Sequence, residues 1–197
     1  MTEEEIILAK KNLRCRIQNL RKSMPKDERD RKSKIIIDKL KETNFFVKAQ
    51  IVMLYASTAY EVQIYPLIEH GIATGKTVLL PLITGKGKME AAKINSLAEL
   101  APDKYGILSP DKDNAKIVAP ADIDLIIVPG AAFTADGHRL GLGGGYYDRF
   151  LPEAEKAYRV ALAFDFQLAD NLPMASHDEK VDAVITENKI FFCNERQ

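Results

Sequence analysis

The chain has 197 residues, 46% of them hydrophobic, which is enough to bury the core of a single domain. Its 28 basic residues equal its 28 acidic ones, so the molecule as a whole carries no field that would gather nucleic acid or an anionic membrane. The charge is uneven locally, because 14 basic but only eight acidic residues lie at or before Lys48. That imbalance leaves room for a polyanionic partner near the N-terminal third.

The cysteines and the N-terminal segment bear on the compartment. Cys15 and Cys193 lack the paired spacing of a metal knuckle or a disulfide framework. The chain starts with acidic residues where a signal peptide needs basic ones, and no apolar stretch approaches the ~20 residues of a membrane span. We therefore expect a cytoplasmic monomer that binds neither membranes nor nucleic acid.

Two amphipathic helices are predicted at the N-terminus. Between residues 3 and 22, apolar residues recur near helical spacing among many charges. Pro25 interrupts this pattern, and the apolar stripe within residues 35–40 predicts a second helix. The chain is thus expected to open with a helical hairpin.

Short apolar runs alternate with helical segments along the rest of the chain. Runs typical of strands covered on both faces are residues 50–57, 77–82, 124–128 and 159–164, with a last strand within 184–192. Helices are predicted at residues 65–73 and 146–157, and a hairpin with loops at 84–119. This alternation predicts one layered α/β domain, residues 1–197, with a largely parallel sheet.

A cluster of glycines marks the junction between a predicted strand and a predicted helix. Six of the 11 glycines fall between Gly130 and Gly145. Glycine lets backbone N–H groups approach a ligand closely, and a helix start favours phosphate. A mobile loop or tight turn is the alternative, but Arg139 precedes the run and two tyrosines, Asp148 and Arg149 follow it. We therefore expect the run to bind phosphate.

Two common phosphate-binding motifs do not account for these glycines. The dinucleotide pattern G-x-G-x-x-G fits Gly141 and Gly143 but requires a small residue where Tyr146 stands. The segment GIATGKT resembles a P-loop, yet it has one residue too few between its glycines and follows a helix instead of a strand. Its glycines, Gly71 and Gly75, are interpreted as a helix end and a turn.

A longer motif is more specific. Residues 139–148, RLGLGGGYYD, resemble the signature of the 5-formyltetrahydrofolate cyclo-ligase family. Lys10 and Arg14 resemble the family's first ATP-contacting motif, and Glu61, shortly after the QIVMLYAS run, falls where the family has a folate-contacting glutamate. The sequence HDEKVD at residues 177–182 resembles the closing motif, so four motifs in the family's order span residues 10–182.

The resemblance implies a fold and a reaction. The implied fold is a three-layer α/β/α domain with a largely parallel, mixed central sheet. The implied enzyme is a ligase that forms a C–N bond, converting 5-formyltetrahydrofolate to 5,10-methenyltetrahydrofolate with ATP and Mg²⁺ and releasing ADP and phosphate. In the implied mechanism the formyl oxygen receives the γ-phosphoryl group, folate N10 attacks the resulting iminium carbon, and phosphate departs.

The resemblance also implies the residues of the site. Those implied to contact ATP are Lys10, Lys11, Asn12, Leu13, Arg14, Arg139, Leu140, Gly141, Leu142, Gly143, Gly144, Gly145, Tyr146 and Tyr147. Those implied to contact the folate are Ala56, Glu61, Leu142, Gly143, Gly144, Gly145 and Tyr146. The implied Mg²⁺ ligands are Asp148 and Asp182, with Asp178 and Glu179 as nearby rivals for the metal.

The residue types suit these roles, although each has a simpler interpretation. Lys10 and Arg14 are four apart on a predicted helix and can hold one polyphosphate, or they can belong to a solvated face. Glu61 can accept two pterin N–H groups, or it can be an acid at a helix start. His138 and His177 are lone polar-loop histidines, and the reaction needs no base of their strength.

The glycine run differs from that of some family members. Those members have Arg at the position of Leu142 and Lys at that of Gly144, so this chain lacks two cations. The candidates to replace them are Arg139, Arg149, Lys10, Lys11 and Arg14. Tyr146 and Tyr147 can stack on a ring of either substrate, or one of them can be a core residue.

Two other classes of function are weighed against the enzyme. A module that binds folate or nucleotide without turnover could dispense with the metal carboxylates, yet Asp148 and Asp182 are both present. An RNA-binding role for the basic N-terminal helices is disfavoured by the neutral total charge and the absence of an aromatic-basic RNA motif. The enzyme is the preferred hypothesis.

Overall fold

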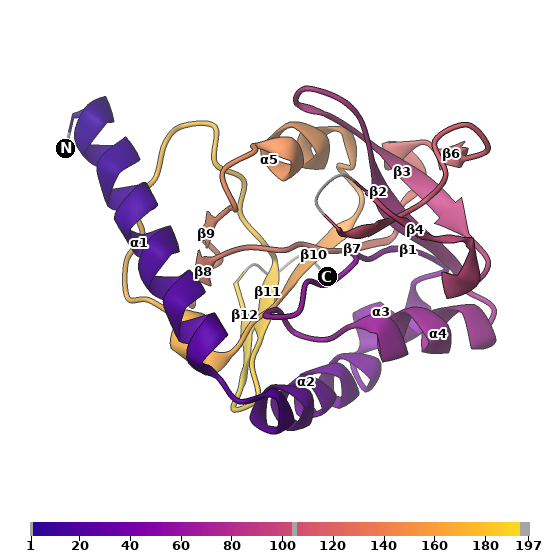
Figure 1. Cartoon of the computed structure of the whole chain (residues 1–197), viewed down its shortest axis with the longest axis horizontal. Coiled ribbons are helices and arrows are strands. Elements are labelled where there is room, and N and C mark those ends of the chain that lie inside the picture. The colour runs from indigo at the N-terminus through magenta and orange to yellow at the C-terminus, as the bar shows by residue number, and fades with distance from the viewer. Residues whose placement is uncertain (1, 104–105, 194–197) are drawn as a thin grey trace.

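A computed structural model describes residues 2–103 and 106–193 (Figure 1). Its helices are α1 (Glu3–Ser23), α2 (Lys26–Lys41), α3 (Asn44–Lys48), α4 (Tyr65–Ala73) and α5 (Tyr146–Phe150). The large sheet contains β1 (Ile51–Met53), β2 (Thr77–Gly85), β3 (Lys88–Ile94), β6 (Lys116–Val118), β7 (Leu125–Ile127), β10 (Tyr158–Leu162), β11 (Ala183–Ile185) and β12 (Ile190–Phe192). Two small ribbons pair β4 (Ala101–Pro102) with β5 (Leu108–Ser109) and β8 (Ala132–Phe133) with β9 (Arg139–Leu140).

The described part of the chain builds one mixed sheet of eight strands. The order is β12-β11-β10-β7-β1-β2-β3-β6, and the five central strands from β11 to β2 run parallel. β12 joins one edge antiparallel, and β3 and β6 extend the other edge in the same way. The predicted α/β fold with a largely parallel, mixed sheet is confirmed.

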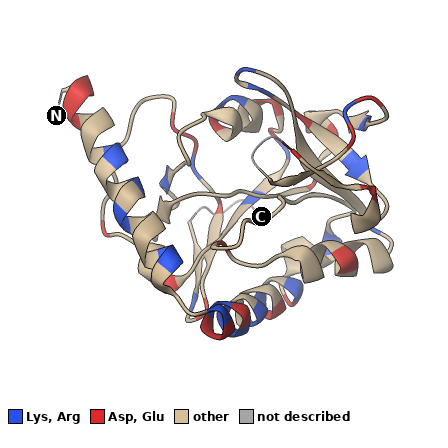
Figure 2. Ribbon diagram, viewed as in Figure 1, with Lys and Arg blue, Asp and Glu red and all other residues tan. Residues whose placement is uncertain are grey.

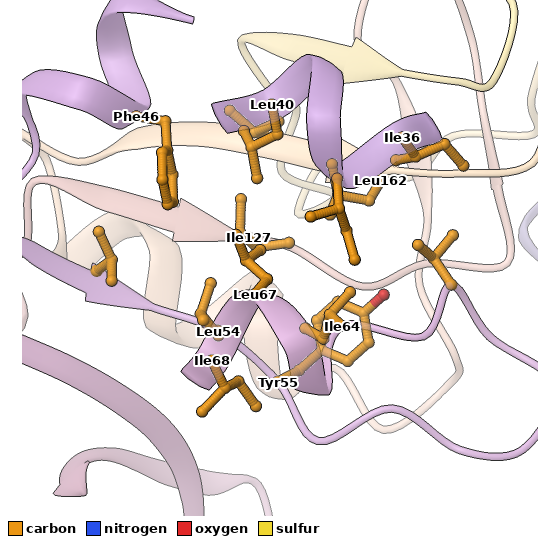
Figure 3. Packing of buried hydrophobic residues seen from close by; sticks show 14 of the residues in the cluster. Ile36, Leu40, Phe46, Leu54, Tyr55, Ile64, Leu67, Ile68, Ile127 and Leu162 are labelled. Carbon is orange, nitrogen blue, oxygen red and sulfur yellow. The ribbon is translucent and has the colours of Figure 1, made fainter. Parts of the chain in front are cut away.

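Both faces of the sheet are buried, which explains why its strands are continuous apolar runs. Alternate residues of β1 point to opposite faces, so Val52 joins one core cluster and Met53 the other. The cluster of Val52 is covered by α2, α3 and α4, through residues such as Leu40, Phe46 and Leu67 (Figure 3). Phe150 of α5 closes the opposite face, which gives the three layers.

The first two helices follow each other as predicted and diverge after Pro25 (Figure 1). α2 packs on the sheet, whereas α1 lies beside the β8–β9 ribbon. Its apolar contact there is a small cluster in which Ile17 packs against Ala131, Ala132 and Leu140. α1 therefore stands against loops at the sheet's edge and outside the main core. Among the described helices, none combines the length and the hydropathy that crossing a bilayer requires.

Several predicted elements have different bounds in the structure. The helix predicted over residues 146–157 ends at Phe150, because Pro152 has no N–H to donate and a 3₁₀ turn, Leu151–Glu153, takes its place. The last predicted strand is two strands, β11 and β12, paired antiparallel. The short helix α3 escaped prediction, since five residues are too few for a periodic pattern.

The topology defines a crevice at one edge of the sheet. From β1 the chain crosses to β2 through α4 on one face, whereas from β7 it crosses to β10 through α5 on the other. β1 and β7 are neighbours, so the connections that follow them separate in opposite directions. Ligands of open α/β sheets bind at such a point, beyond the carboxyl ends of the strands.

A substitution at Gly137, in the turn between β8 and β9, tests the packing at this edge of the sheet. The φ of Gly137 is +88°, and a Cβ there would lie 2.3 Å from the Val181 carbonyl oxygen. Gly137→Ala should therefore lower the free energy of unfolding by about 3 kcal/mol or more, combining left-handed strain with a backbone clash. Gly75→Ala is the matched control, because Gly75 has φ +80° but open space around its Cβ position, and it should cost about 1 kcal/mol. Equal losses in urea unfolding would contradict the described packing.

Candidate active site

One face of α1 carries basic side chains that reach three separate loops. Lys10 pairs with Asp178 in the loop before β11. Arg14 donates its Nε–H to the Gly141 carbonyl oxygen at 2.8 Å, and Arg21 donates from Nη2 to the Gly130 carbonyl oxygen at 2.5 Å. Blue segments accordingly recur along α1 in Figure 2. The helix is thus attached to the glycine-rich segment largely through charged groups.

These contacts enclose an open cleft of about 570 Å³ between α1, the glycine run and the loop at residues 174–178. Its lining residues are Glu3, Ile6, Ile7, Lys10, Arg14, Gly141, Gly143, Gly145, Asp148, Met174, Ala175, Ser176, His177 and Asp178. The structure therefore brings the Lys10 and Arg14 face together with the glycine run and its Asp148, and with His177 and Asp178 of the closing motif, three motifs that are far apart in the sequence.

The glycine run has the backbone that only glycine adopts easily. Gly143 and Gly145 have φ of +109° and +63°, and Gly145 caps α5. A Cβ on Gly144 would lie 2.7 Å from the Tyr146 ring, so that ring covers the run closely. Because α5 has only five residues, the helix dipole expected from the longer predicted helix is weak. Backbone N–H groups and nearby cations are left to attract phosphate.

The cations that could replace those absent at Leu142 and Gly144 differ in availability. Arg149 donates to the carbonyl oxygens of Gly144 at 2.6 Å and Gly87 at 2.8 Å, which ties the run to the β2–β3 hairpin. Arg139 is buried and pairs with Asp148. Lys11 is exposed and does not line the cleft. Lys10 and Arg14 are the cations that line it.

Other residues predicted in the ATP group occupy different surroundings. Asn12 is exposed on α1, beside Lys11. Leu13 packs against the small cluster around Ile17, and Leu140 is buried in β9 within the same cluster. These two leucines pack α1 against the β8–β9 ribbon. They therefore hold one wall of the cleft in place and do not line it.

The two predicted metal ligands lie in unlike settings. Asp148 lines the cleft, where its Oδ1 also accepts the Glu179 backbone N–H at 3.3 Å. Asp182 is 2% exposed, does not line the cleft and accepts the Arg159 backbone N–H at 2.9 Å. Within residues 2–103 and 106–193, no three His, Cys, Asp or Glu side chains form a group that could hold a metal. Asp182 as a metal ligand stays a prediction.

The crevice beyond β1 and β7 contains a buried carboxylate. Glu61 is buried, its Oε2 accepts the Thr58 backbone N–H at 2.8 Å, and its Oε1 lies 3.8 Å from Arg21 Nη1. Burial raises the pKa of Tyr55 well above its ordinary value, and the nearby charge of Glu61 adds to that effect. Burial likewise raises the pKa of Tyr147, with Glu61 adding to the shift and Arg139 opposing it. Glu61 thus lies among neutral phenols and arginines.

Polar groups without partners also occur here. The Tyr147 hydroxyl is buried and has no hydrogen bond to any described residue. Such a group is costly unless a ligand or water satisfies it. Ala56, predicted to touch folate, is buried just after β1 at the same edge, whereas Leu142 is exposed at the tip of the run. The Tyr146 ring faces the Arg149 guanidinium at 5.8 Å.

The histidines stay outside this chemistry. His138 precedes the glycine run, and its Nδ1 lies 2.9 Å from Asp136 Oδ2. His177 lines the outer part of the cleft, but its side chain is 76% exposed. Neither is buried beside a reacting position.

Sequence reasoning missed two residues of the site and the role of a third. Arg21 was one of them, although its spacing from Lys10 and Arg14 continues the same helical stripe and could have revealed it. Tyr55 offered no signal inside an apolar run. Asp178 was considered only as a metal rival, and its pairing with Lys10 joins residues 168 positions apart.

The fold and the cleft define a layered α/β enzyme that places an anion-attracting cleft beside a buried carboxylate. A model of the 5-formyltetrahydrofolate cyclo-ligase family matches residues 6–187. The chain is 29% identical to mouse 5-formyltetrahydrofolate cyclo-ligase, covering 91% of this chain and 94% of that one. It is 33% identical to the Escherichia coli K12 enzyme of that name, covering 74% and 82%.

A solved structure agrees with the sequence relatives. The NMR structure of Aquifex aeolicus 5,10-methenyltetrahydrofolate synthetase superposes with a TM-score of 0.85 at 34% identity, covering 95% of this chain and 94% of that one. The chain belongs to the 5-formyltetrahydrofolate cyclo-ligase family and is a ligase.

The contact of Arg21 with Glu61 and Gly130 yields a stability prediction. Arg21→Met should lower the free energy of unfolding by about 2–4 kcal/mol, because it leaves a buried carboxylate and a carbonyl without their cation. Arg16→Met, an exposed change on the same helix, should cost little. Urea unfolding measures both, and adding Glu61→Gln to Arg21→Met should recover part of the loss. No recovery would mean that the carboxylate is not the source of the cost.

Proposed function

We propose that this chain uses ATP and Mg²⁺ to cyclise 5-formyltetrahydrofolate to 5,10-methenyltetrahydrofolate, releasing ADP and phosphate. The observation that carries the proposal is the convergence of Lys10 and Arg14 on the glycine run, next to the crevice that holds Glu61. A nucleotide and a folate could therefore lie side by side. Family membership, shown above, supports the same substrates.

The cleft suits the polyphosphate. Phosphoryl transfer asks the protein mainly for positioning and positive charge around the transferring oxygens. Lys10 and Arg14 supply that charge, and the open backbone of Gly143 supplies close N–H groups. Burial alone would raise the pKa of Asp178, but hydrogen bonds from Ala175 N–H and Lys10 outweigh it and lower the pKa. Asp178 is thus an anion at neutral pH, and phosphate would compete with it for Lys10.

The crevice suits the pterin. A carboxylate such as Glu61 accepts two adjacent N–H donors side by side, as the amino group and ring N–H of a pterin provide. Arg21 Nη1 lies 3.8 Å from Glu61 Oε1 and adds a positive charge beside the carboxylate, and the Tyr147 hydroxyl offers a further hydrogen bond in the same buried space. Buried polar groups of this kind favour a ligand that can pair with all of them.

The chemical steps then follow. The formyl oxygen attacks the γ-phosphorus, a new P–O bond forms, and the bond to ADP breaks. Folate N10 attacks the activated carbon, the C–O bond breaks, and phosphate leaves with that oxygen while N10 loses its proton. Lys10 and Arg14 stabilise the charge of the transferring phosphoryl group, and the closed crevice at Glu61 keeps the pterin oriented.

The metal fits the donor set at Asp148. Mg²⁺ is usually held by one or two carboxylates together with phosphate oxygens and water, so a cluster of three protein ligands is unnecessary. Asp148 lines the cleft beside the glycine run, and this position supports its proposed role as a ligand. Bound there, Mg²⁺ would neutralise charge on the phosphates. Asp182 is proposed as the second carboxylate on the strength of the motif alone.

The decisive assay mixes the purified protein with 5-formyltetrahydrofolate, ATP and Mg²⁺ and follows methenyltetrahydrofolate by absorbance. Asp148→Asn should reduce kcat/KM at least about 100-fold and shift the Mg²⁺ dependence to higher concentration, since a carboxylate ligand is lost. Asp170→Asn, an exposed change outside the cleft, should leave both unchanged. No product from the unaltered protein would overturn the proposal in favour of a binding module.

The α1 face yields a separate kinetic prediction. Lys10→Ala and Arg14→Ala should each raise the apparent KM for ATP about tenfold, because each removes one cation from the phosphates. Lys11→Ala is the matched control, since Lys11 is a neighbouring lysine that does not line the cleft. Steady-state kinetics with ATP varied at saturating folate measures all three, and unchanged nucleotide kinetics in the first two would contradict the role of this face.

A further inference from the structure

A second and larger cleft lies along α2, and it shares no lining residue with the active-site cleft. Its volume is about 710 Å³, and it separates α2 from the loop that leads into α4. Its lining residues are Lys26, Arg29, Asp30, Ser33, Lys34, Ile37, Asp38, Lys41, Ala59, Gln63, Tyr65 and Pro66. We name it the α2 cleft. Four cations and two carboxylates line it, so its charge is positive although the chain as a whole is neutral.

The lysines of the α2 cleft already have partners on their own helix. Lys26 pairs with Asp30, and Lys34 and Lys41 both pair with Asp38. The pKa of Asp38 is lowered by its hydrogen bonds from those two lysines. These three lysines therefore each have a carboxylate partner on the helix and give no reason by themselves to expect a ligand.

Arg29 is different. Its residue is 9% exposed, its Nε is buried without a hydrogen bond, and its guanidinium has no ion pair or hydrogen bond with any residue in the described ranges. A guanidinium presents five donors in a planar fork that matches an oxyanion. A largely buried charge without a counter-ion is costly, and its position on the wall of a cleft favours the binding of an anion there.

We propose that the α2 cleft is a binding site for an oxyanion, a carboxylate or a phosphate, held by the Arg29 guanidinium. The anion can come from a free molecule or from the glutamate end of a folate whose pterin lies at Glu61. Both sources present the same chemistry to Arg29, and the site itself does not rest on the proposed reaction.

The α2 cleft is joined to the Glu61 crevice by a short series of contacts. Ser33, one turn after Arg29 on α2, accepts the Gln63 backbone N–H at 3.0 Å. The Gln63 side chain in turn donates to the carbonyl oxygens of Thr58 at 2.8 Å and Glu61 at 2.7 Å. An anion at Arg29 thus lies against the loop that positions the buried carboxylate.

The test is a pair of NMR titrations of ¹⁵N-labelled full-length protein, without ATP, at constant ionic strength. One uses inorganic phosphate and the other γ-linked triglutamate. Saturable shifts of the Ser33 and Gln63 amides are expected with at least one of them. Saturation with triglutamate alone assigns the anion to a folate tail, and saturation with phosphate alone assigns it to a free anion.

Arg29→Gln should weaken the saturable binding about tenfold or more, because charge-assisted hydrogen bonds are lost. Arg31→Gln is the matched control, since it removes the same charge from an exposed position of α2 outside the cleft. Arg29→Lys, which keeps the charge but not the planar fork, serves if Arg29→Gln does not fold. Shifts that stay linear in the unaltered protein, or that persist undiminished after the change at Arg29, would overturn the proposal. Because no turnover is measured, that result is independent of the ligase assay.

Discussion

The attachment of α1 through Lys10, Arg14 and Arg21 is the interaction on which the candidate site depends. Each side chain reaches a different loop, namely the one before β11, the glycine run and the one after β7. The apolar contact of this helix is small, so charged hydrogen bonds to carbonyl and carboxylate oxygens hold much of it in place. The residues that position the helix are therefore also residues that can meet an anionic substrate.

This arrangement follows from the topology of the sheet. Since the connections after β1 and β7 leave on opposite faces, a crevice opens between the carboxyl ends of these two strands. α1 closes it from outside. Arg21 is the residue that joins the two sides, because it contacts Gly130 after β7 and Glu61 after β1. The cleft at the glycine run and the crevice at Glu61 consequently share one wall.

The sequence predicted the layers well because both faces of the sheet are buried. Runs such as TVLLPL contain few polar residues, and that signal is local. The local pattern failed at two places. α5 ends earlier than predicted because a 3₁₀ turn that contains a proline follows it, and the residues predicted as one last strand form two strands, β11 and β12, that pair with each other. The site motifs were predicted by resemblance, but the pairing of Lys10 with Asp178 depends on α1 lying against the loop before β11, a tertiary contact that no short sequence pattern predicts.

Charge is used differently in the two clefts. Near the glycine run, Arg139 and Arg149 are held by Asp148 and by carbonyl oxygens, so they shape the loop, and Lys10 can reach a ligand only by leaving Asp178. Where a cation can pair either with a carboxylate of the protein or with a ligand, the fold does not lose stability when no ligand is bound. Arg29 has no such partner, and no residue that the structure describes offsets the cost of its burial. The excess of basic residues before Lys48 is therefore divided between two places, the Lys10 and Arg14 face of α1 and the helix α2, where Arg29 pairs with no residue that the structure describes.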